Sequence, residues 1–147
     1  MNKKNIFIFL TALVVVILDQ STKFLVRKKF KLGESVPLVK NIFHFTYASN
    51  TGSAFSIFQG HNLFFIIFSA VVISVVIYYL KNIKDNEKAI QFAVGLLLGG
   101  TIGNLIDRIL IGAVTDFIDF IIWPVFNIAD SAVTASAILL IFLMWKK

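Results

Sequence analysis

Residues 89–111 read AIQFAVGLLLGGTIGNLIDRILI, and this stretch decides the class of fold. As an α-helix it is long enough to cross the roughly 30 Å of hydrocarbon in a lipid bilayer. Its charged residues, Asp107 and Arg108, lie near one end. A charge in the middle of a bilayer costs at least about 2.5 to 3.5 kcal/mol, so we expect this end of the helix to lie close to one membrane surface.

Three further stretches have the same character, and the composition agrees with them. Hydrophobic residues make up 58% of the chain and charged residues 15%, whereas soluble domains are about half apolar and about a quarter charged. The first stretch contains Asp19 and Lys23 in place of a small-residue cleavage motif, so it is interpreted as a retained helix and not as a signal peptide. The sequence predicts a single α-helical integral membrane domain over 1–147, with four transmembrane helices at residues 6–26, 63–80, 89–111 and 128–145.

Two connecting segments do not fit a transmembrane helix. In residues 27–62, aromatic residues at 43, 45 and 47 alternate with other residues, a period of two that predicts a strand. A strand with unpaired backbone cannot lie in lipid, so we expect residues 27–62 to form a small β-like platform on the membrane surface. Residues 112–127 are half apolar, too short to span, and contain a Trp-Pro pair at 123–124, which indicates a short interfacial helix or loop.

Several kinds of chemistry are excluded by what the chain lacks. There is no Cys, which rules out disulfides and a cysteine nucleophile. The two histidines, His44 and His61, do not have the i, i+4 spacing typical of a helical metal site, so we expect no metal centre, no cofactor and no Ser-His-Asp triad. Much of the formal net charge of +6 lies in clusters beside the spans, which favours anionic membrane lipids over nucleic acid as the partner.

Basic residues next to the spans indicate the orientation, because cytoplasmic loops are enriched in Lys and Arg. Four spans place both termini on the same side. Seven basic residues lie on that side: Lys3, Lys4, Lys81, Lys84, Lys88, Lys146 and Lys147. Five lie in the platform: Arg27, Lys28, Lys29, Lys31 and Lys40. We therefore expect cytoplasmic termini and a platform on the outer face.

Most acidic residues lie where a membrane protein should avoid them. The following lie within or at the ends of apolar segments: Asp19, Asp107, Asp116, Asp119 and Asp130. The predicted topology gathers all of them near the outer face, and acids concentrated at one depth indicate a functional site.

Three features of this region have both a structural and a functional interpretation. Asp19 and Lys23 are spaced i, i+4 and can form a structural ion pair, with catalysis by Lys23 as the alternative. Glycines recur every four residues from 95 to 103, a spacing that favours close helix packing over ligand contacts. Arg108 can bind a lipid phosphate or extend to the interface.

Asp116 and Asp130 are the candidate catalytic pair, since a turn between them can bring both carboxyls together. Two carboxyls in a site of low dielectric constant hold one proton between them. The ionised member can then take a proton from water while the protonated member polarises a scissile carbonyl, which hydrolyses a peptide bond without a metal or a nucleophilic side chain. In the structural alternative both residues cap or anchor helix ends, and Asp119, one helical turn from Asp116, is a competing candidate.

Five short motifs follow one another along the chain. They are Asp-Gln-Ser-Thr-Lys at 19–23, Asn-Thr-Gly-Ser-Ala-Phe at 50–55, Gly-Gly-Thr-Ile-Gly-Asn-Leu-Ile-Asp-Arg at 99–108, Val-Thr-Asp-Phe at 114–117 and Phe-Asn-Ile-Ala-Asp at 126–130. Together they resemble the lipoprotein signal peptidase family (signal peptidase II) over essentially the whole chain. Each motif is weak alone, but five in order argue strongly against chance.

The resemblance implies an aspartic endopeptidase in the bacterial cytoplasmic (inner) membrane. It would remove the signal peptide from prolipoproteins, cleaving just before a Cys that carries a diacylglyceryl group, and globomycin-like cyclic peptides would be its inhibitor class. Asp116 and Asp130 would form the catalytic dyad, and Asp119 would be a bystander. The residues that would bind substrate or support the dyad are Asn50, Gly52, Asn104, Arg108 and Asn127, and Asp19 with Lys23 would hold structure near it.

Two features depart from the family pattern. Ser53 stands where Ala is common, and the link from Asp119 to Phe126 is short, so an interfacial flap over the site is expected to be truncated.

Two other functions remain open on the residues alone. One is a small proton-coupled membrane transporter whose carboxylates relay protons, and the other is a lipid-binding scaffold without chemistry.

Overall fold

A computed structural model describes residues 2–52 and 60–145 of the chain. Within these residues there are four long helices: α1 (Lys3–Lys29), α2 (Asn62–Tyr79), α3 (Lys88–Leu110) and α4 (Ile128–Trp145). All four are long and apolar enough to cross a membrane. The predicted class, an α-helical membrane protein with four transmembrane helices, is confirmed for the part of the chain described.

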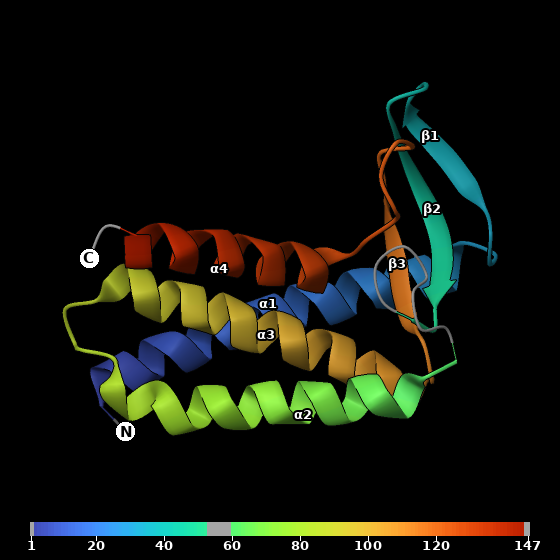
Figure 1. The fold of residues 1–147 in the computed structure, drawn as a ribbon. Coiled ribbons are helices and arrows are strands. Elements are labelled where there is room, and N and C mark those ends of the chain that lie inside the picture. Colours follow the sequence, from blue (N-terminus) through green and yellow to red (C-terminus); the bar gives the residue numbers. More distant parts are fainter. Residues whose placement is uncertain (1, 53–59, 146–147) are drawn as a thin grey trace.

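The helix α3 lies at the centre of the bundle (Figure 1). It packs against α1, α2 and α4, whereas α2 meets the bundle almost entirely through α3. Glycines allow this close approach on two sides of α3. A Cβ on Gly99 would lie 2.7 Å from the carbonyl oxygen of Ala12 in α1, and one on Gly100 would lie 2.5 Å from that of Ala129 in α4. Gly99 thus lies in a close helix contact, as the four-residue spacing predicts, and Gly100, which is outside that series, makes a second close contact with α4.

The helix α1 extends beyond the predicted span at both ends. The side chain of Asn2 caps its start by accepting from the backbone N–H of Asn5 at 3.1 Å. Three basic residues, Arg27, Lys28 and Lys29, occupy its last turn, where the helix dipole favours positive charge. After α2, a short 3₁₀ turn, η2 (Leu80–Asn82), leads into the polar loop before α3.

A small antiparallel sheet supplies the predicted surface platform. Its strand order is β1 (Ser35–Val39), β2 (Phe43–Asn50) and β3 (Val114–Asp119). The strand expected from the alternating aromatic residues is β2, and it pairs with β1 as a hairpin.

The expectation for residues 112–127 is wrong in one respect. Instead of an interfacial helix, or a loop throughout, this segment contains β3, which pairs with the second edge of β2 from Asn50↔Val114 to His44↔Asp119. A two-stranded hairpin is marginal on its own, and a third strand satisfies the backbone groups along its free edge. Only the remainder of the segment, from Phe120 to the start of α4, connects the elements without a helix.

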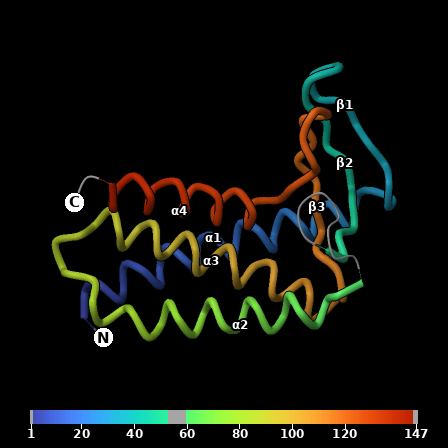
Figure 2. Tube along the Cα trace, viewed as in Figure 1, coloured from blue at the N-terminus to red at the C-terminus, as the bar shows by residue number. Residues whose placement is uncertain are grey.

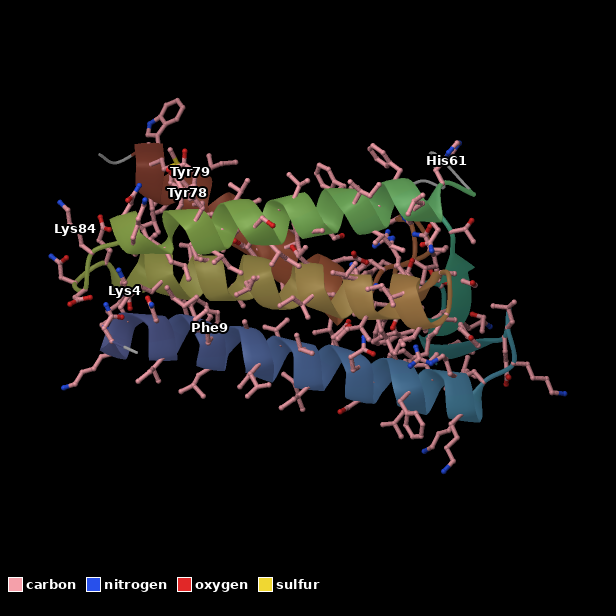
Figure 3. All side chains as sticks on the ribbon, turned by 90° about the horizontal axis from the view of Figure 1, so that it is seen from below. Lys4, Phe9, His61, Tyr78, Tyr79 and Lys84 are labelled. Carbon is pink, nitrogen blue, oxygen red and sulfur yellow. The ribbon has the colours of Figure 1, made fainter. Side chains whose placement is uncertain are left out.

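The sheet and the chain termini lie at opposite ends of the bundle (Figures 1 and 2). The strands run across the helix axes at the end where α1 and α3 finish and α2 and α4 begin. In Figure 3, Lys4 and Lys84 lie at the terminal end, and His61, just before α2, lies at the sheet end. The sheet end is therefore where the candidate acids meet.

Candidate active site

The two candidate catalytic carboxyls come from different elements at the sheet end. Asp116 is in β3 and only 2% exposed, and Asp130 is in the first turn of α4. Asn127 lies between them. Its Nδ2 donates to Asp116 Oδ1 at 2.6 Å, and its Oδ1 accepts from the backbone N–H of Asp130 at 2.8 Å. Both aspartates line the same cavity, so a strand, a short link and a helix bring the pair together.

Asp130 also takes part in capping α4. Its Oδ2 accepts from the backbone N–H of Asn127 at 3.2 Å, which reciprocates the bond from Asp130 N–H to Asn127 Oδ1. The two residues thus form a capping box at the start of the helix. The capping alternative for Asp130 is therefore compatible with a place in the cavity, and its Oδ1 accepts instead from Asn104 Nδ2 at 2.7 Å.

The protonation of Asp116 is strongly shifted. Burial raises the pKa of Asp116, and the negative charge of Asp130 raises it further, to about 7. Hydrogen bonds from Asn50 and Asn127 oppose the shift, because they stabilise the ionised carboxylate. With a pKa of about 7, the carboxyl of Asp116 is protonated in about half of the molecules near neutral pH and can donate a proton.

The pair opens into a cavity of about 1210 Å³ with mostly apolar walls. The walls come from α2, α3 and α4, with β3 and residues 123–126 at the sheet end. Because α2 and α4 meet mainly through α3, the cavity extends between them along the helices, as far as Val72 and Ile138. It is larger than the roughly 300 to 1,000 Å³ of most small-molecule pockets. A long apolar ligand can therefore lie beside the two carboxyls.

A buried ionic cluster supports the pair from the α1 side. Lys23 and Asp19 are fully buried and 2.9 Å apart, so the predicted ion pair forms. Asp107 is 1% exposed and lies 3.5 Å from both Lys23 Nζ and Arg27 Nη1. Two cations thus face two carboxylates, and their attraction offsets part of the desolvation free energy of burying four charges.

The two carboxylates of this cluster each hold the backbone beside one member of the candidate pair. Asp19 Oδ1 accepts from the N–H of Ala129, the residue before Asp130, at 2.9 Å. Asp107 Oδ2 accepts from the N–H of Thr115, the residue before Asp116, also at 2.9 Å. The cluster therefore fixes the strand and the helix that carry the pair relative to α1 and α3.

The other residues carried over from the family motifs lie around the cavity. Asn50 donates from Nδ2 to Asp116 Oδ2 at 3.1 Å, and its Oδ1 accepts from the N–H of Gly52 at 2.9 Å. Arg108 donates to the carbonyl of Gly52 at 3.2 Å and lies over the ring of Phe65 at 4.8 Å. Arg108 thus connects α3 to Gly52, just after β2, and it also lines the cavity. Ser53 lies outside the described residues.

Asp119 is separated from the pair by the geometry of the strand. Successive side chains of a strand point to opposite faces, so residues three apart, such as Asp116 and Asp119, face opposite ways. Asp119 accepts from Thr46 Oγ1 at 2.6 Å and from the N–H of Ile121 at 2.8 Å. It is a structural residue of the sheet and its following turn, consistent with the bystander role implied by the family motifs.

Two residues that contact the ionic cluster, Gln20 and Arg27, are missing from the sequence-based set. Gln20 donates to Asp19 Oδ2 and Asp107 Oδ1, both at 3.1 Å, and Arg27 donates to Thr115 Oγ1 at 3.0 Å. A signal for Arg27 was available, because it continues the i, i+4 series that Asp19 and Lys23 begin. Within residues 2–52 and 60–145, no three His, Cys, Asp or Glu side chains are arranged to hold a metal ion.

Comparison with known proteins decides the family. The sequence pattern of signal peptidase (SPase) II matches residues 11–146. The chain belongs to the signal peptidase II family. The family resemblance predicted from the five motifs is thereby confirmed.

Relatives of known name agree with membership of this family. A lipoprotein signal peptidase of Halothermothrix orenii is 46% identical over 141 residues, which cover 95% of this chain and 96% of the relative. One of Bacillus subtilis is 39% identical over 140 residues, covering 92% and 91%. A solved bacterial membrane enzyme, determined by the in meso method at 2.3 Å resolution, is 38% identical and matches with a TM-score of 0.87 over 95% of this chain and 87% of that chain.

Membership of the signal peptidase II family makes the chain a peptidase of a bacterial, multi-pass membrane family. Family membership therefore favours a peptidase over the two alternative functions, a proton-coupled transporter and a lipid-binding scaffold.

Proposed function

We propose that the chain is an aspartic endopeptidase that removes the signal peptide from lipid-modified prolipoproteins, using water activated by Asp116 and Asp130. The observation that carries the proposal is that Asn127 donates to both carboxyls, from its side-chain amide to Asp116 and from its backbone N–H to Asp130, beside a long, mostly apolar cavity. A family of signal peptidases supplies the reaction class, and the carboxyl pair supplies a way to perform it.

The first step is the attack of water on the scissile carbonyl. The ionised carboxyl of the pair takes one proton from the water as its oxygen bonds to the carbonyl carbon. The protonated carboxyl transfers its proton to the carbonyl oxygen, so the product is a neutral tetrahedral diol. Hydrogen bonds from Asn50, Asn104 and Asn127 hold both carboxyls in fixed orientations, so little reorganisation is needed.

The second step breaks the carbon–nitrogen bond. The carboxyl that took the proton from water now gives it to the departing nitrogen, and one hydroxyl of the diol returns its proton to the other carboxyl. The products are a carboxylic acid on the signal peptide and a free amine on the lipoprotein. The pair returns to its starting state, with one shared proton, and can begin another catalytic cycle.

The cavity fits a substrate that is itself partly lipid. Its walls between α2 and α4 are mostly apolar, which suits the acyl chains of a diacylglyceryl-Cys and the apolar core of a signal peptide. Arg108 lines the same space and can donate to an ester or peptide carbonyl. Globomycin-like cyclic peptides would compete for this cavity.

The location follows from the charges and from the position of the sheet. With both termini cytoplasmic, as the basic residues at that end favour, the sheet and the carboxyl pair lie at the outer face of the bacterial cytoplasmic membrane. A substrate anchored by its lipid would reach the pair from within the outer leaflet.

The substrate assignment is tested with two synthetic prolipoprotein peptides that differ only in whether the Cys carries a diacylglyceryl group. In detergent or lipid, we expect cleavage of the lipidated peptide immediately before the Cys, identified by mass spectrometry of both products. Cleavage of both peptides at equal rates would contradict a site that recognises the lipid, and cleavage of neither would contradict the proposed substrate class.

A further inference from the structure

Lys23 is a buried cation with one contact that its ion pair does not explain. Its side chain is fully buried in α1, and its Nζ lies 2.9 Å from Asp19 and 3.5 Å from Asp107. These two carboxylates suffice to compensate its charge. A third hydrogen bond, of 2.8 Å, runs instead to Asn104 Oδ1 in α3, toward the cavity.

This contact determines which way the Asn104 amide points. An ammonium group can only donate, so Asn104 must turn its oxygen toward Lys23 and its nitrogen the other way. The nitrogen then donates to Asp130 Oδ1 at 2.7 Å. Asn127 Nδ2 donates to the same Asn104 oxygen at 3.2 Å, so a flipped amide would place its N–H₂ group against two donors.

The consequence is that Asp130 is surrounded by donors. Its Oδ1 receives the Asn104 amide and its Oδ2 receives the backbone N–H of Asn127. It also lies in the first turn of α4, where the helix dipole favours a negative charge. An ionised carboxylate, which only accepts hydrogen bonds, fits these surroundings. Both oxygens of Asp116 also receive amide donors, from Asn127 and Asn50. What distinguishes Asp130 is its place in the first turn of α4 and the contact of its donor, Asn104, with the Lys23 cation.

We propose that Lys23 is a positioning residue that acts through Asn104 to keep Asp130 the ionised, proton-accepting member of the pair, which leaves the shared proton on Asp116. This inference rests on the proposed function of the pair in hydrolysis. It assigns Asp130 to activate water and Asp116 to protonate the carbonyl oxygen. The pKa of Asp116, raised to about 7 mainly by burial, agrees with that division.

Other charges around Asp130 set the sign of each test. The charged groups of the described elements packed around it are Asp19, Lys23 and Arg27 in α1, Asp107 and Arg108 in α3, and Asp116 in β3. Lys23 is connected to Asp130 through the side-chain amide of Asn104 alone. Asp19 accepts a hydrogen bond from the backbone N–H of Ala129, the residue before Asp130. Removing the cation should make ionisation of Asp130 harder, and removing the anion should make it easier.

The test compares pH profiles of kcat/KM for wild type, Lys23→Met and Asp19→Asn on the lipidated peptide. For Lys23→Met we expect kcat/KM to fall about 10- to 100-fold and the acidic limb to move up by roughly half a pH unit or more. For Asp19→Asn we expect the acidic limb to move down. Lys4→Met is the matched control, because Lys4 is also buried in α1 but bonds to the Ile83 carbonyl at the terminal end, so its limb should not move.

Shifts of opposite sign support the positioning role, since a loss of structure lowers the rate without moving the two limbs in opposite directions. An unmoved acidic limb in folded Lys23→Met, or shifts of the same sign in both variants, overturns the inference while the proposed function stands. If neither variant accumulates as folded protein, both residues are structural and the inference is wrong. If the wild type does not cleave, the proposed function fails and this inference falls with it.

Discussion

Replacing Asn127 with Ala would separate helix capping from catalysis at the carboxyl pair. The side chain makes two kinds of contact: it caps α4 through the Asp130 N–H at 2.8 Å, and it donates to Asp116 Oδ1 at 2.6 Å. Loss of an N-cap costs about 1 kcal/mol of folding stability. Loss of a hydrogen bond to a charged or proton-sharing carboxyl costs about 1.5 to 3 kcal/mol. If the second loss falls on the transition state, kcat/KM decreases roughly 10- to 150-fold, at about 1.4 kcal/mol per factor of ten.

A matched variant isolates the capping part of this effect. Asn2 caps α1 at the opposite end of the protein, so Asn2→Ala also loses a cap but touches no part of the site. Initial rates on the lipidated peptide and thermal unfolding in the same detergent would be measured for both variants. We expect similar small decreases in Tm, with a large decrease in kcat/KM for Asn127→Ala alone. Equal catalytic losses in the two variants would refute the reasoning that Asn127 serves the reaction.

Three further predictions concern protonation and substrate binding. Because the pKa of Asp116 is about 7, kcat/KM should decrease on the alkaline side with a midpoint near pH 7, and a profile that is flat from about pH 6 to about pH 9 would contradict this. The same raised pKa means that the folded wild type loses stability as pH rises from the ordinary Asp value of 3.8 toward about 7. Asp116→Asn should therefore have a higher Tm than wild type at about pH 8 but not at about pH 4, and a lower Tm at both would count against a destabilised, buried carboxyl. Arg108→Met removes the bond to the Gly52 carbonyl and the contact with Phe65, so initial rates should show KM raised roughly 5- to 30-fold with kcat changed less, whereas a purely catalytic loss would contradict a binding role.

The helices were predictable from the sequence because length and hydrophobicity alone are enough to specify a membrane span. The strand β3 was not, because its partner β2 lies far away in the sequence, and long-range strand pairing leaves no local signal. That error also explains why Asp119 competes with Asp116 on sequence grounds. In a helix, residues three apart share a face, whereas in a strand they face opposite ways, so only the observed element separates the two acids.

The site shows the same division between local and long-range information. The ion pair of Asp19 and Lys23 follows from their i, i+4 spacing, and it forms. What the spacing cannot show is that Asp19 and Asp107 hold the backbone next to each candidate catalytic residue, or that Lys23 orients Asn104. Those contacts join residues of different elements, and they depend on the close approach of α1 and α4 to α3 that the glycines permit.

The central claim is that Asp116 and Asp130 together hydrolyse the signal peptide, and the most direct test is cleavage of the lipidated prolipoprotein peptide by Asp116→Asn and Asp130→Asn in the presence of a chelator. Each amide keeps the shape of the carboxyl but cannot ionise. Asp119→Asn serves as the control on the same strand. We expect wild type and Asp119→Asn to cleave at comparable rates in chelator, and both other variants to be folded but inactive. Retained activity in either Asp116→Asn or Asp130→Asn, or loss of wild-type activity in the chelator, would contradict the account.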